Sequence, residues 1–269
     1  MGNCNNDSTI KEKNEKESQN KIKFSDFTKL YPIGKSGIST IWKVQLIEKG
    51  KQIINNNNKN FFAMKIINKA KIYIKKIVKS IENNRRLMEK FNYKLLCKMY
   101  YAFQDKENLY FVVEYFSRDD LRYHICKKDY FYEKETKFII SCIALIINYL
   151  HENNVIHRDI KPIFGNNGYL YLTGLSLAME CKKEETVISA SGTPGYMAPE
   201  AIINKPHNFS VDYFALGIIL YELTMGERPY QGKDRKEIKE KMFNVEINVD
   251  KNDIPSDWDI NVAELINGF

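Results

Sequence analysis

The chain has 269 residues, of which 43% are hydrophobic and 28% charged, and its formal net charge is +7. This length can bury a sizeable core, as one large domain or as two lobes. No run of eighteen apolar residues occurs and the N-terminus is polar, so we expect neither a membrane-spanning helix nor a secretory signal. The five cysteines lack paired spacing, which favours reduced thiols over disulfides or zinc ligands.

The predicted elements begin after a polar segment. Residues 1–23 are rich in Asn, Lys, Glu and Ser, so we expect a disordered tail. A β-rich stretch opens at Phe24, and residues 38–47 and 61–67 show the alternation and β-branched residues of strands. The Asn-rich segment between these two strands predicts an expanded hairpin loop without a chemical role.

The middle of the chain changes from strands to helices. Residues 77–91 have helical periodicity, and residues 99–103 and 109–113 have the pattern of strands. Five further helices are predicted, over residues 119–126, 133–153, 211–225 and 235–243 and from 259 onward. Strands followed by helices predict an α+β fold with two lobes. We expect a tail over 1–23, a β-rich N-lobe over 24–113, a connector over 114–117 and an α-helical C-lobe over 118–269.

Basic residues crowd one stretch of the N-terminal half. Lysines are dense between Lys65 and Lys79, and Arg85 and Arg86 follow. A solvated helical surface is one interpretation, and a contact with anionic lipid or an acidic partner is another. The patch lacks interleaved recognition motifs, so we expect no binding to nucleic acid.

The most informative motif is H-R-D-I-K-P at residues 157–162. It resembles the catalytic loop of protein kinases, in which the Asp accepts the proton of the substrate hydroxyl and an Asn five positions later holds magnesium. Asp159 matches that Asp, whereas Phe164 stands at the Asn position. The resemblance implies catalytic roles for Asp159 and Lys161 and a phosphate-pairing role for Arg158.

Other motifs extend the resemblance over residues 24–269. F-A-M-K at 62–65 matches the family's V-A-I-K, and G-T-P-G-Y-M-A-P-E at 192–200 matches the end of the activation segment. The chain is therefore similar to serine/threonine protein kinases of the AGC group. F-Q-D at 103–105 and D-L-R-Y-H at 120–124 suggest the YANK-like branch of that group.

The resemblance implies a nucleotide site that takes ATP. Lys65 would hold the α and β phosphates, Val113 stands at the gatekeeper position, and the main chain of Glu114 and Phe116 would bond the adenine edge. The nucleotide-binding residues that it implies are Ile33, Gly34, Ile41, Ala63, Lys65, Val113, Glu114, Phe116 and Asp120.

The resemblance also implies structural and regulatory residues. The carboxylate of Asp212 is expected to accept backbone N–H groups of the catalytic loop, because buried polar groups need partners. Further structural positions are Asn84, Met88, Met99, His157, Leu175 and Glu200. The activation segment carries Thr186, Ser189, Ser191 and Thr193. One interpretation is that these residues are phosphorylated and that Arg158 pairs with the phosphate. The other is that the segment is a plain polar loop.

Two departures from the family lie in the N-terminal half. In the glycine-rich loop, Ser36 and Ser39 replace the second and third glycines, so we expect a weaker phosphate cradle. In the helix over 77–91, Glu82 and Asn84 compete for the position that pairs with Lys65. Met88 follows Asn84 by four residues and supplies the expected apolar contact, so Asn84 is preferred. An amide cannot neutralise the ammonium of Lys65.

The metal-binding positions depart furthest. Gly174 stands where the family has the metal-binding Asp, although Leu175 keeps the apolar character of the next position. The catalytic loop is about three residues short by comparison with the family's motif, and turn chemistry already explains Asn166. Magnesium needs oxygen ligands, so we expect weak or absent magnesium binding. Glu200 also lacks an evident partner before the sequence stops at Phe269, and an unpaired buried charge costs about 3–5 kcal/mol.

These departures predict a pseudokinase-like protein, weak or inactive in phosphoryl transfer, that acts in signalling by binding nucleotide, protein or both. Losing two metal ligands predicts a rate loss of about 10⁴–10⁶. Two alternatives remain: an active, atypical ATP-dependent serine/threonine kinase that uses Asp159 as base, and a poorly folding, truncated gene product.

The N-terminal sequence resembles a lipidation signal. Gly2 fits a myristoylation site and Cys4 a palmitoylation site, although Asn6 replaces the preferred Ser or Thr. Two acyl chains suffice for stable anchoring. We therefore expect a cytoplasmic protein held peripherally at a membrane, with a tail that merely begins Met-Gly as the alternative.

Overall fold

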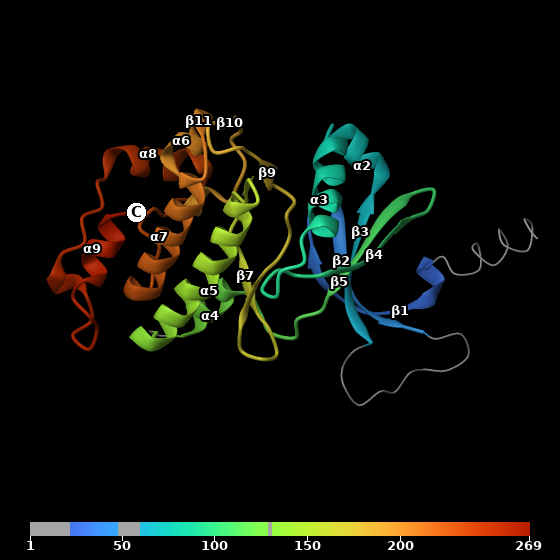
Figure 1. Ribbon diagram of the computed structural model, residues 1–269, viewed down its shortest axis with the longest axis horizontal. Coiled ribbons are helices and arrows are strands. Elements are labelled where there is room, and N and C mark those ends of the chain that lie inside the picture. The colour runs from blue at the N-terminus through green and yellow to red at the C-terminus, as the bar shows by residue number, and fades with distance from the viewer. Residues whose placement is uncertain (1–21, 48–59, 129–130) are drawn as a thin grey trace, which may run out of the picture. The chain divides into compact units, whose positions relative to one another are not determined.

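The computed structural model describes residues 22–47, 60–128 and 131–269 (Figure 1). The chain divides into two compact units: unit 1 comprises residues up to 76 and Met99–Tyr115, and unit 2 comprises Ile77–Lys98 and Phe116–Phe269. The predicted hairpin loop and the lipidation positions Gly2 and Cys4 lie outside the described residues, as does almost all of the predicted tail.

Unit 1 is built on one antiparallel sheet of five strands in the order β1-β2-β3-β5-β4. The strands are β1 (Phe27–Lys35), β2 (Ser39–Leu46), β3 (Phe61–Asn68), β4 (Met99–Gln104) and β5 (Asn108–Glu114). A short 3-10 helix η1 (Phe24–Asp26) precedes β1, and the helix α2 (Lys69–Ile74) follows β3. The sheet places β3, which carries Lys65, between β2 and β5.

Side chains alternate between the two faces of this sheet, as the strand period of two requires. One face forms the hydrophobic core of unit 1, to which β3 contributes Phe62 and Met64 and β5 contributes Tyr110 and Val112. The residues between them, such as Ala63 and Lys65, therefore face the other way. This division explains why a lysine can occupy the central strand.

Unit 2 is mainly helical. Its helices are α3 (Val78–Lys90), α4 (Leu121–Lys127), α5 (Glu133–Glu152), α6 (Pro199–Ile202), α7 (Ser210–Met225), α8 (Arg235–Asn244) and α9 (Val262–Asn267). The unit also has three short antiparallel strand pairs: β6 (Val155–Ile156) with β9 (Met179–Glu180), β7 (Pro162–Phe164) with β8 (Leu170–Leu172), and β10 (Val187–Ile188) with β11 (Pro206–His207). Two 3-10 helices, η2 (Pro194–Tyr196) and η3 (Lys251–Asp253), complete the unit.

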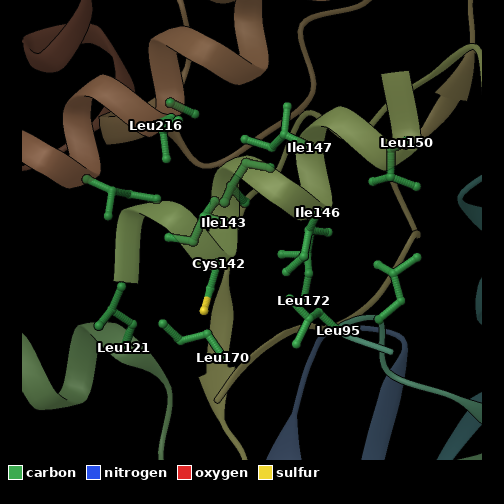
Figure 2. Close-up of a cluster of buried hydrophobic side chains, with 14 of the residues drawn as sticks. Leu95, Leu121, Cys142, Ile143, Ile146, Ile147, Leu150, Leu170, Leu172 and Leu216 are labelled. Atoms are coloured by element: carbon green, nitrogen blue, oxygen red, sulfur yellow. The ribbon is translucent and has the colours of Figure 1, made fainter. Parts of the chain in front are cut away.

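The core of unit 2 lies around α5 and includes residues of α7 and β8 (Figure 2). Ile143, Ile146 and Ile147 of α5 are fully buried and recur at helical spacing. Leu216 of α7 and Leu172 of β8 belong to the same cluster. This core holds both ends of the segment that contains the catalytic-loop motif.

The α+β fold class predicted from the sequence is confirmed, with a strand-rich beginning and a helical remainder. One difference concerns α3, which the sequence analysis placed in the N-lobe. Leu87 of α3 joins the core of unit 2, and the helix groups with that unit. The four described cysteines are free thiols, and none of the described helices is long and apolar enough to cross a membrane.

Candidate active site

The backbone of the catalytic loop is fixed by one buried carboxylate. Asp212, in the first turn of α7, is fully buried, and its Oδ2 and Oδ1 accept the N–H groups of His157 at 2.8 Å and Arg158 at 2.7 Å. The Nε2 of His151 lies 2.9 Å from Oδ2 of the same carboxylate. Arg158 adopts a left-handed backbone with φ of 69°. Asp212 therefore satisfies two N–H groups that would otherwise be buried without a partner.

The first two side chains of the motif turn into unit 2. His157 is buried, and its Nδ1 accepts the N–H of Asp159 at 3.3 Å. Burial lowers the pKa of His157, which outweighs the opposing effect of Asp212. The Nε of Arg158 donates to the carbonyl of Leu177 at 2.7 Å. Both side chains brace the loop rather than point to its exposed side.

The structure brings together three of the predicted site residues at Asp159. Its Oδ1 accepts a hydrogen bond from the hydroxyl of Thr193 at 2.6 Å, and its Oδ2 accepts one from the ammonium of Lys161 at 3.0 Å. The carboxylate is half-buried, and Lys161 is exposed. A carboxylate oriented on both oxygens is a suitable acceptor for a substrate hydroxyl proton.

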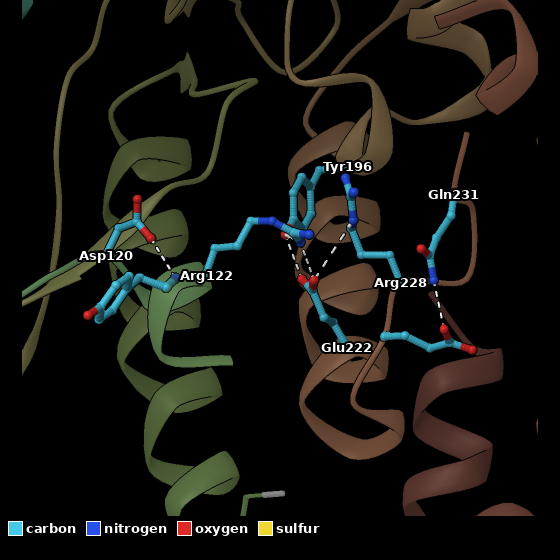
Figure 3. A network of polar contacts seen from close by, with 8 residues as sticks. Asp120, Arg122, Tyr196, Glu222, Arg228 and Gln231 are labelled. Atoms are coloured by element: carbon cyan, nitrogen blue, oxygen red, sulfur yellow. Dashed lines mark hydrogen bonds and ion pairs between the residues drawn. The ribbon is translucent and has the colours of Figure 1, made fainter. Parts of the chain in front are cut away.

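A cavity of about 120 Å³ adjoins this cluster, with Lys161, Thr193, Tyr196, Glu222 and Arg228 among its lining residues. Figure 3 shows the polar network on one of its walls.

Glu222 is the centre of this network and is only 2% exposed. It forms an ion pair with Arg122, accepts a hydrogen bond from the hydroxyl of Tyr196 at 2.5 Å, and lies 3.8 Å from the Nε of Arg228 (Figure 3). Burial and the hydrogen bond to Glu222 raise the pKa of Tyr196, so the phenol stays protonated. The three partners supply the positive charge and the hydrogen bonds that a buried carboxylate requires.

Sequence reasoning missed Glu222, although a signal was present. It is the single charged residue between Phe214 and Thr224, a stretch that otherwise reads as a buried helix. A charge in such a position needs partners from neighbouring elements. The partners Arg122, Tyr196 and Arg228 come from α4, η2 and the segment after α7, which no sequence pattern connects.

The first metal-binding position of the family is taken by a β-hairpin. Phe164 lies in β7, and its ring packs against His124 with the centroids 5.0 Å apart. Asn166 occupies the following turn, where its Oδ1 accepts a hydrogen bond from the hydroxyl of Ser117. The turn itself is closed by Gly165 and Tyr169, whose backbone N–H and carbonyl lie 2.8 Å apart. Asn166 is thus part of the turn, in keeping with the turn chemistry of its sequence.

The second metal-binding position carries no side chain. Gly174 follows β8 with φ of 72°, and an added Cβ would meet nothing within 4 Å. Leu175, the next residue, is buried in the core of unit 2. Among the described residues no cluster of three His, Cys, Asp or Glu side chains could hold a metal ion. These positions therefore do not fit the magnesium ions that the family uses.

Helix α3 turns Asn84 inward and Glu82 outward. Asn84 is 2% exposed, Glu82 is exposed, and Met88 packs half-buried against the core of unit 2. This is the helix phase that the spacing of Asn84 and Met88 predicted. The Oδ1 of Asn84 is buried without a hydrogen-bond partner among the described residues. A buried acceptor without a partner costs about 1–3 kcal/mol, so this position destabilises the fold.

Other residues of α3 bind the segment after Gly174. Ser80 donates to the carbonyl of Ser176 at 3.0 Å, and Asn83 donates to the carbonyl of Ala178 at 2.9 Å. Arg86 pairs with Glu180 at 2.8 Å, and this pair lowers the pKa of the Glu180 carboxyl. Contacts of this kind hold the segment in place without a cation.

The predicted phosphorylation residues are spread along the activation segment. Thr186 is exposed, whereas the hydroxyls of Ser189 and Ser191 lie 2.9 Å apart. Gly192 has φ of 141°, and an added Cβ would stand 2.8 Å from the carbonyl of Arg158, so only glycine fits there.

Two expectations about partners concern Arg158 and Glu200. The Nη1 of Arg158 is buried without a partner among the described residues. Its role in pairing a phosphate stays a prediction.

Glu200 accepts a hydrogen bond from the hydroxyl of Ser210 at 3.5 Å, and no ion pair reaches it within the part of the chain that the structure describes. The expectation that Glu200 lacks an ion-pair partner stays a prediction.

Five of the predicted nucleotide residues of unit 1 lie on one face of its sheet: Gly34, Ile41, Ala63, Lys65 and Val113. Ile41 pairs across the strands with Gly34 and with Lys65, and Ala63 pairs with Val113. Paired residues share a face, and this face is the one opposite the core of unit 1. Burial lowers the pKa of Lys65. Of the other predicted residues, Ile33, Met99 and Glu114 belong to unit 1, and Phe116 and Asp120 to unit 2.

The turn after Gly34 uses its own N–H groups. The hydroxyl oxygen of Ser36 accepts the N–H of Ser39 at 3.1 Å and that of Ile38 at 3.4 Å, and lies 2.9 Å from the hydroxyl of Ser39. N–H groups in such a turn are the donors that a phosphate would need. Ser36 therefore competes with a phosphate for them.

Comparison with known proteins agrees with this geometry. The model of the protein kinase domain family matches residues 48–267. The chain is 33% identical to the serine/threonine-protein kinase sgk-1 of Caenorhabditis elegans over 250 residues, 91% of this chain and 51% of that protein. It is 33% identical to human serine/threonine-protein kinase 32B over 84% of this chain and 55% of that protein. Mouse ribosomal protein S6 kinase alpha-3 is 30% identical over 82% of this chain and 30% of its own length.

The chain therefore belongs to the eukaryotic-type serine/threonine protein kinase family and is AGC-like. It spans about half the length of the first two of these relatives.

Proposed function

We propose that this kinase-family chain is a pseudokinase-like protein that binds a nucleotide and a protein partner in signalling and transfers phosphate weakly or not at all. The observation that carries the proposal is the chemistry of the two metal positions. Phe164 and Gly174 offer no oxygen ligand from a side chain, and Asn166 is engaged by Ser117 in the hairpin turn.

The missing ligands matter more than the retained base. Phosphoryl transfer depends on positioning and on neutralising the charge of the polyphosphate. Removal of one preorganised electrostatic group costs about 10²–10³ in rate, and two such losses cost about 10⁴–10⁶. A general base supplies about 10²–10⁴ and needs a correctly held phosphate. Asp159 cannot offset the loss.

A transfer assay tests this proposal. The full-length chain and its Asp159→Asn variant are incubated with ATP labelled at the γ-phosphate, magnesium and a protein or peptide acceptor. We expect the two proteins to release and transfer label at the same background rate. Turnover by the wild-type chain that Asp159→Asn abolishes would contradict the proposal.

Binding of the nucleotide is measured separately, as the shift in melting temperature with ATP. The proposal expects a shift of equal size with magnesium and with a chelator, because no side chain ligand recruits the cation. Human and nematode relatives named as serine/threonine kinases support ATP as the nucleotide to test first.

The second candidate function is an active, atypical serine/threonine kinase. The observation in its favour is the state of Asp159, whose two oxygens are already oriented by Thr193 and Lys161. A thermal shift with ATP that disappears on chelation, together with the turnover described above, would establish it. The third possibility, a poorly folding product, predicts a broad and non-cooperative unfolding transition. A sharp transition would exclude it.

Acylation at Gly2 and Cys4, with a cytoplasmic location at a membrane surface, remains our proposal from the N-terminal sequence. Cell fractionation of the Gly2→Ala variant tests it. We expect the variant to move from the membrane fraction to the supernatant, and an unchanged distribution would remove the proposal.

A further inference from the structure

Two adjacent apolar side chains protrude at the end of α2 in unit 1. Tyr73 is 70% exposed and Ile74 is 79% exposed, more than any other large hydrophobic residue in the described part of the chain. Single exposed apolar residues are ordinary on protein surfaces. Two neighbours exposed to this degree, at the end of one helix, are a feature that needs an explanation.

The geometry of α2 explains why they protrude. The helix starts at Asn68, whose Oδ1 accepts the N–H of Lys71 at 3.1 Å, and it buries Ile72 alone. It ends when Lys76 adopts a left-handed backbone with φ of 54°. Residues 73–76 are all exposed, and so is Lys71 one turn earlier.

Positive charge surrounds this exposed end of α2. Lys69, Lys71, Lys75 and Lys76 lie within eight residues, and the sequence has no Asp or Glu between residues 61 and 81. The nearby Asp105 uses its carboxylate within its own turn, where it accepts the N–H groups of Glu107 and Asn108 and the hydroxyl of Tyr110. Lys69 bonds the carbonyl of Asp105 instead.

We propose that this α2 tip, made of Lys71, Tyr73, Ile74, Lys75 and Lys76, docks on an anionic lipid surface. Tyr73 and Ile74 enter the headgroup region, where an amphipathic ring and an aliphatic side chain are both stable. The lysines attract acidic headgroups, and each contributes about fivefold to the affinity when it lies near the surface.

The size and shape of the tip favour lipid over a protein partner. A stable protein interface buries roughly 800 Å² on each partner. A six-residue helix that protrudes at its end cannot supply such an area by itself. A bilayer needs only a few inserted side chains and a cluster of cations. The proposal does not require acylation, because the tip itself supplies both the apolar side chains and the cations.

Vesicle co-sedimentation of the full-length, unacylated chain tests the proposal. The vesicles contain phosphatidylcholine alone or with phosphatidylserine. We expect binding only to the anionic vesicles, and weaker binding at high salt because the lysine contribution is screened. Failure of the wild-type chain to bind anionic vesicles would overturn the proposal.

Two variants separate the apolar from the charged contribution. Tyr73→Ser with Ile74→Ser removes the inserted side chains, and Lys71→Gln with Lys76→Gln removes two charges. Lys75 is left unchanged because its ammonium lies beside Gly37, 3.1 Å from where a Cβ would stand. We expect each double variant to bind roughly tenfold more weakly or worse. The lysine variant is expected to lose most of the salt dependence as well.

The matched controls change exposed residues of the same types elsewhere. Ile188→Ser alters an apolar residue of β10 that is 62% exposed, and Lys183→Gln with Lys239→Gln removes two exposed charges. These variants are expected to bind vesicles like the wild-type chain. Equal losses in the controls and the α2 variants would overturn the proposal. So would α2 variants that keep vesicle binding and lose an acidic protein partner.

Discussion

The residues before and after Pro162 contrast sharply within unit 2. Before it, the loop is complete, with Asp159 oriented by Thr193 and Lys161 and its backbone held by Asp212. After it, a short hairpin and Gly174 stand where the family binds magnesium. The comparison teaches that the scaffold of the base and the ligands of the cation depend on different residues, so one set can be kept without the other.

The physical reason lies in what each set does for the fold. Asp212 satisfies buried N–H groups, so its loss would destabilise the folded chain whether or not a substrate binds. Metal ligands stabilise the structure mainly when the ion is present. Without them, Leu172 and Leu175 on either side of Gly174 still reach the core of unit 2.

The largest expected effect, on stability, comes from removing the carboxylate of Asp212, which holds the retained part of the catalytic loop. Asp212→Ala leaves the N–H groups of His157 and Arg158 buried without an acceptor, and each such group costs about 1–3 kcal/mol. We expect the free energy of unfolding to fall by about 2–5 kcal/mol, measured by denaturant titration.

Glu184→Gln is the matched control, since it changes an exposed carboxylate of the same unit and should cost less than about 0.5 kcal/mol. A loss below about 1 kcal/mol for Asp212→Ala would mean that the loop does not depend on this carboxylate.

The second expected effect comes from restoring a carboxylate at one of the two metal positions. Gly174→Asp places a carboxylate where a Cβ meets no atom within 4 Å, and Asp is among the residues that visit left-handed backbone. We expect ATP to bind about tenfold more tightly with magnesium than with chelator, which corresponds to about 1.4 kcal/mol. Melting temperature as a function of ATP concentration measures it.

The control for this repair is Gly168→Asp. Gly168 also has positive φ, 82°, and open space around its Cβ, so the backbone strain is matched. The control should have a lower melting temperature than the wild-type chain, because of its positive φ, and gain no magnesium dependence. Equal magnesium responses in the two variants would show that the site at residue 174 is not a metal position.

The smallest expected effect concerns pH and His157. Burial lowers the folded-state pKa of His157 from 6.5, so below pH 6.5 the unfolded chain binds a proton that the folded chain does not. Stability is therefore lost as the pH falls, by about 1 kcal/mol between pH 6.5 and 5.5.

His157→Phe should remove this part of the acid dependence. The other three histidines of the chain remain in both proteins, so the difference between the two denaturation series isolates His157. An unchanged slope in the variant would show that the pKa of His157 is the same in the folded and the unfolded chain.

Periodicity and motif chemistry were enough to predict most elements of the fold. The helices predicted at 77–91 and 133–153 appear as α3 and α5, within two residues at each end. The inward position of Asn84 followed from the four-residue spacing to Met88. Short segments were harder: α2 and the pairs β6–β9 and β10–β11 were not predicted, because their few residues depend on contacts with distant parts of the chain.

The sequence by itself determined the family, the order of strands and helices, and the loss of oxygen ligands at the two metal positions, because all of these are carried by residue type and local spacing. The tertiary structure decided which groups meet. It joined Glu222 to Arg122, Tyr196 and Arg228, turned the Ser36 hydroxyl onto its own loop, and left Tyr73 and Ile74 uncovered. Such contacts depend on the packing of elements far apart in the chain, which a local pattern does not encode.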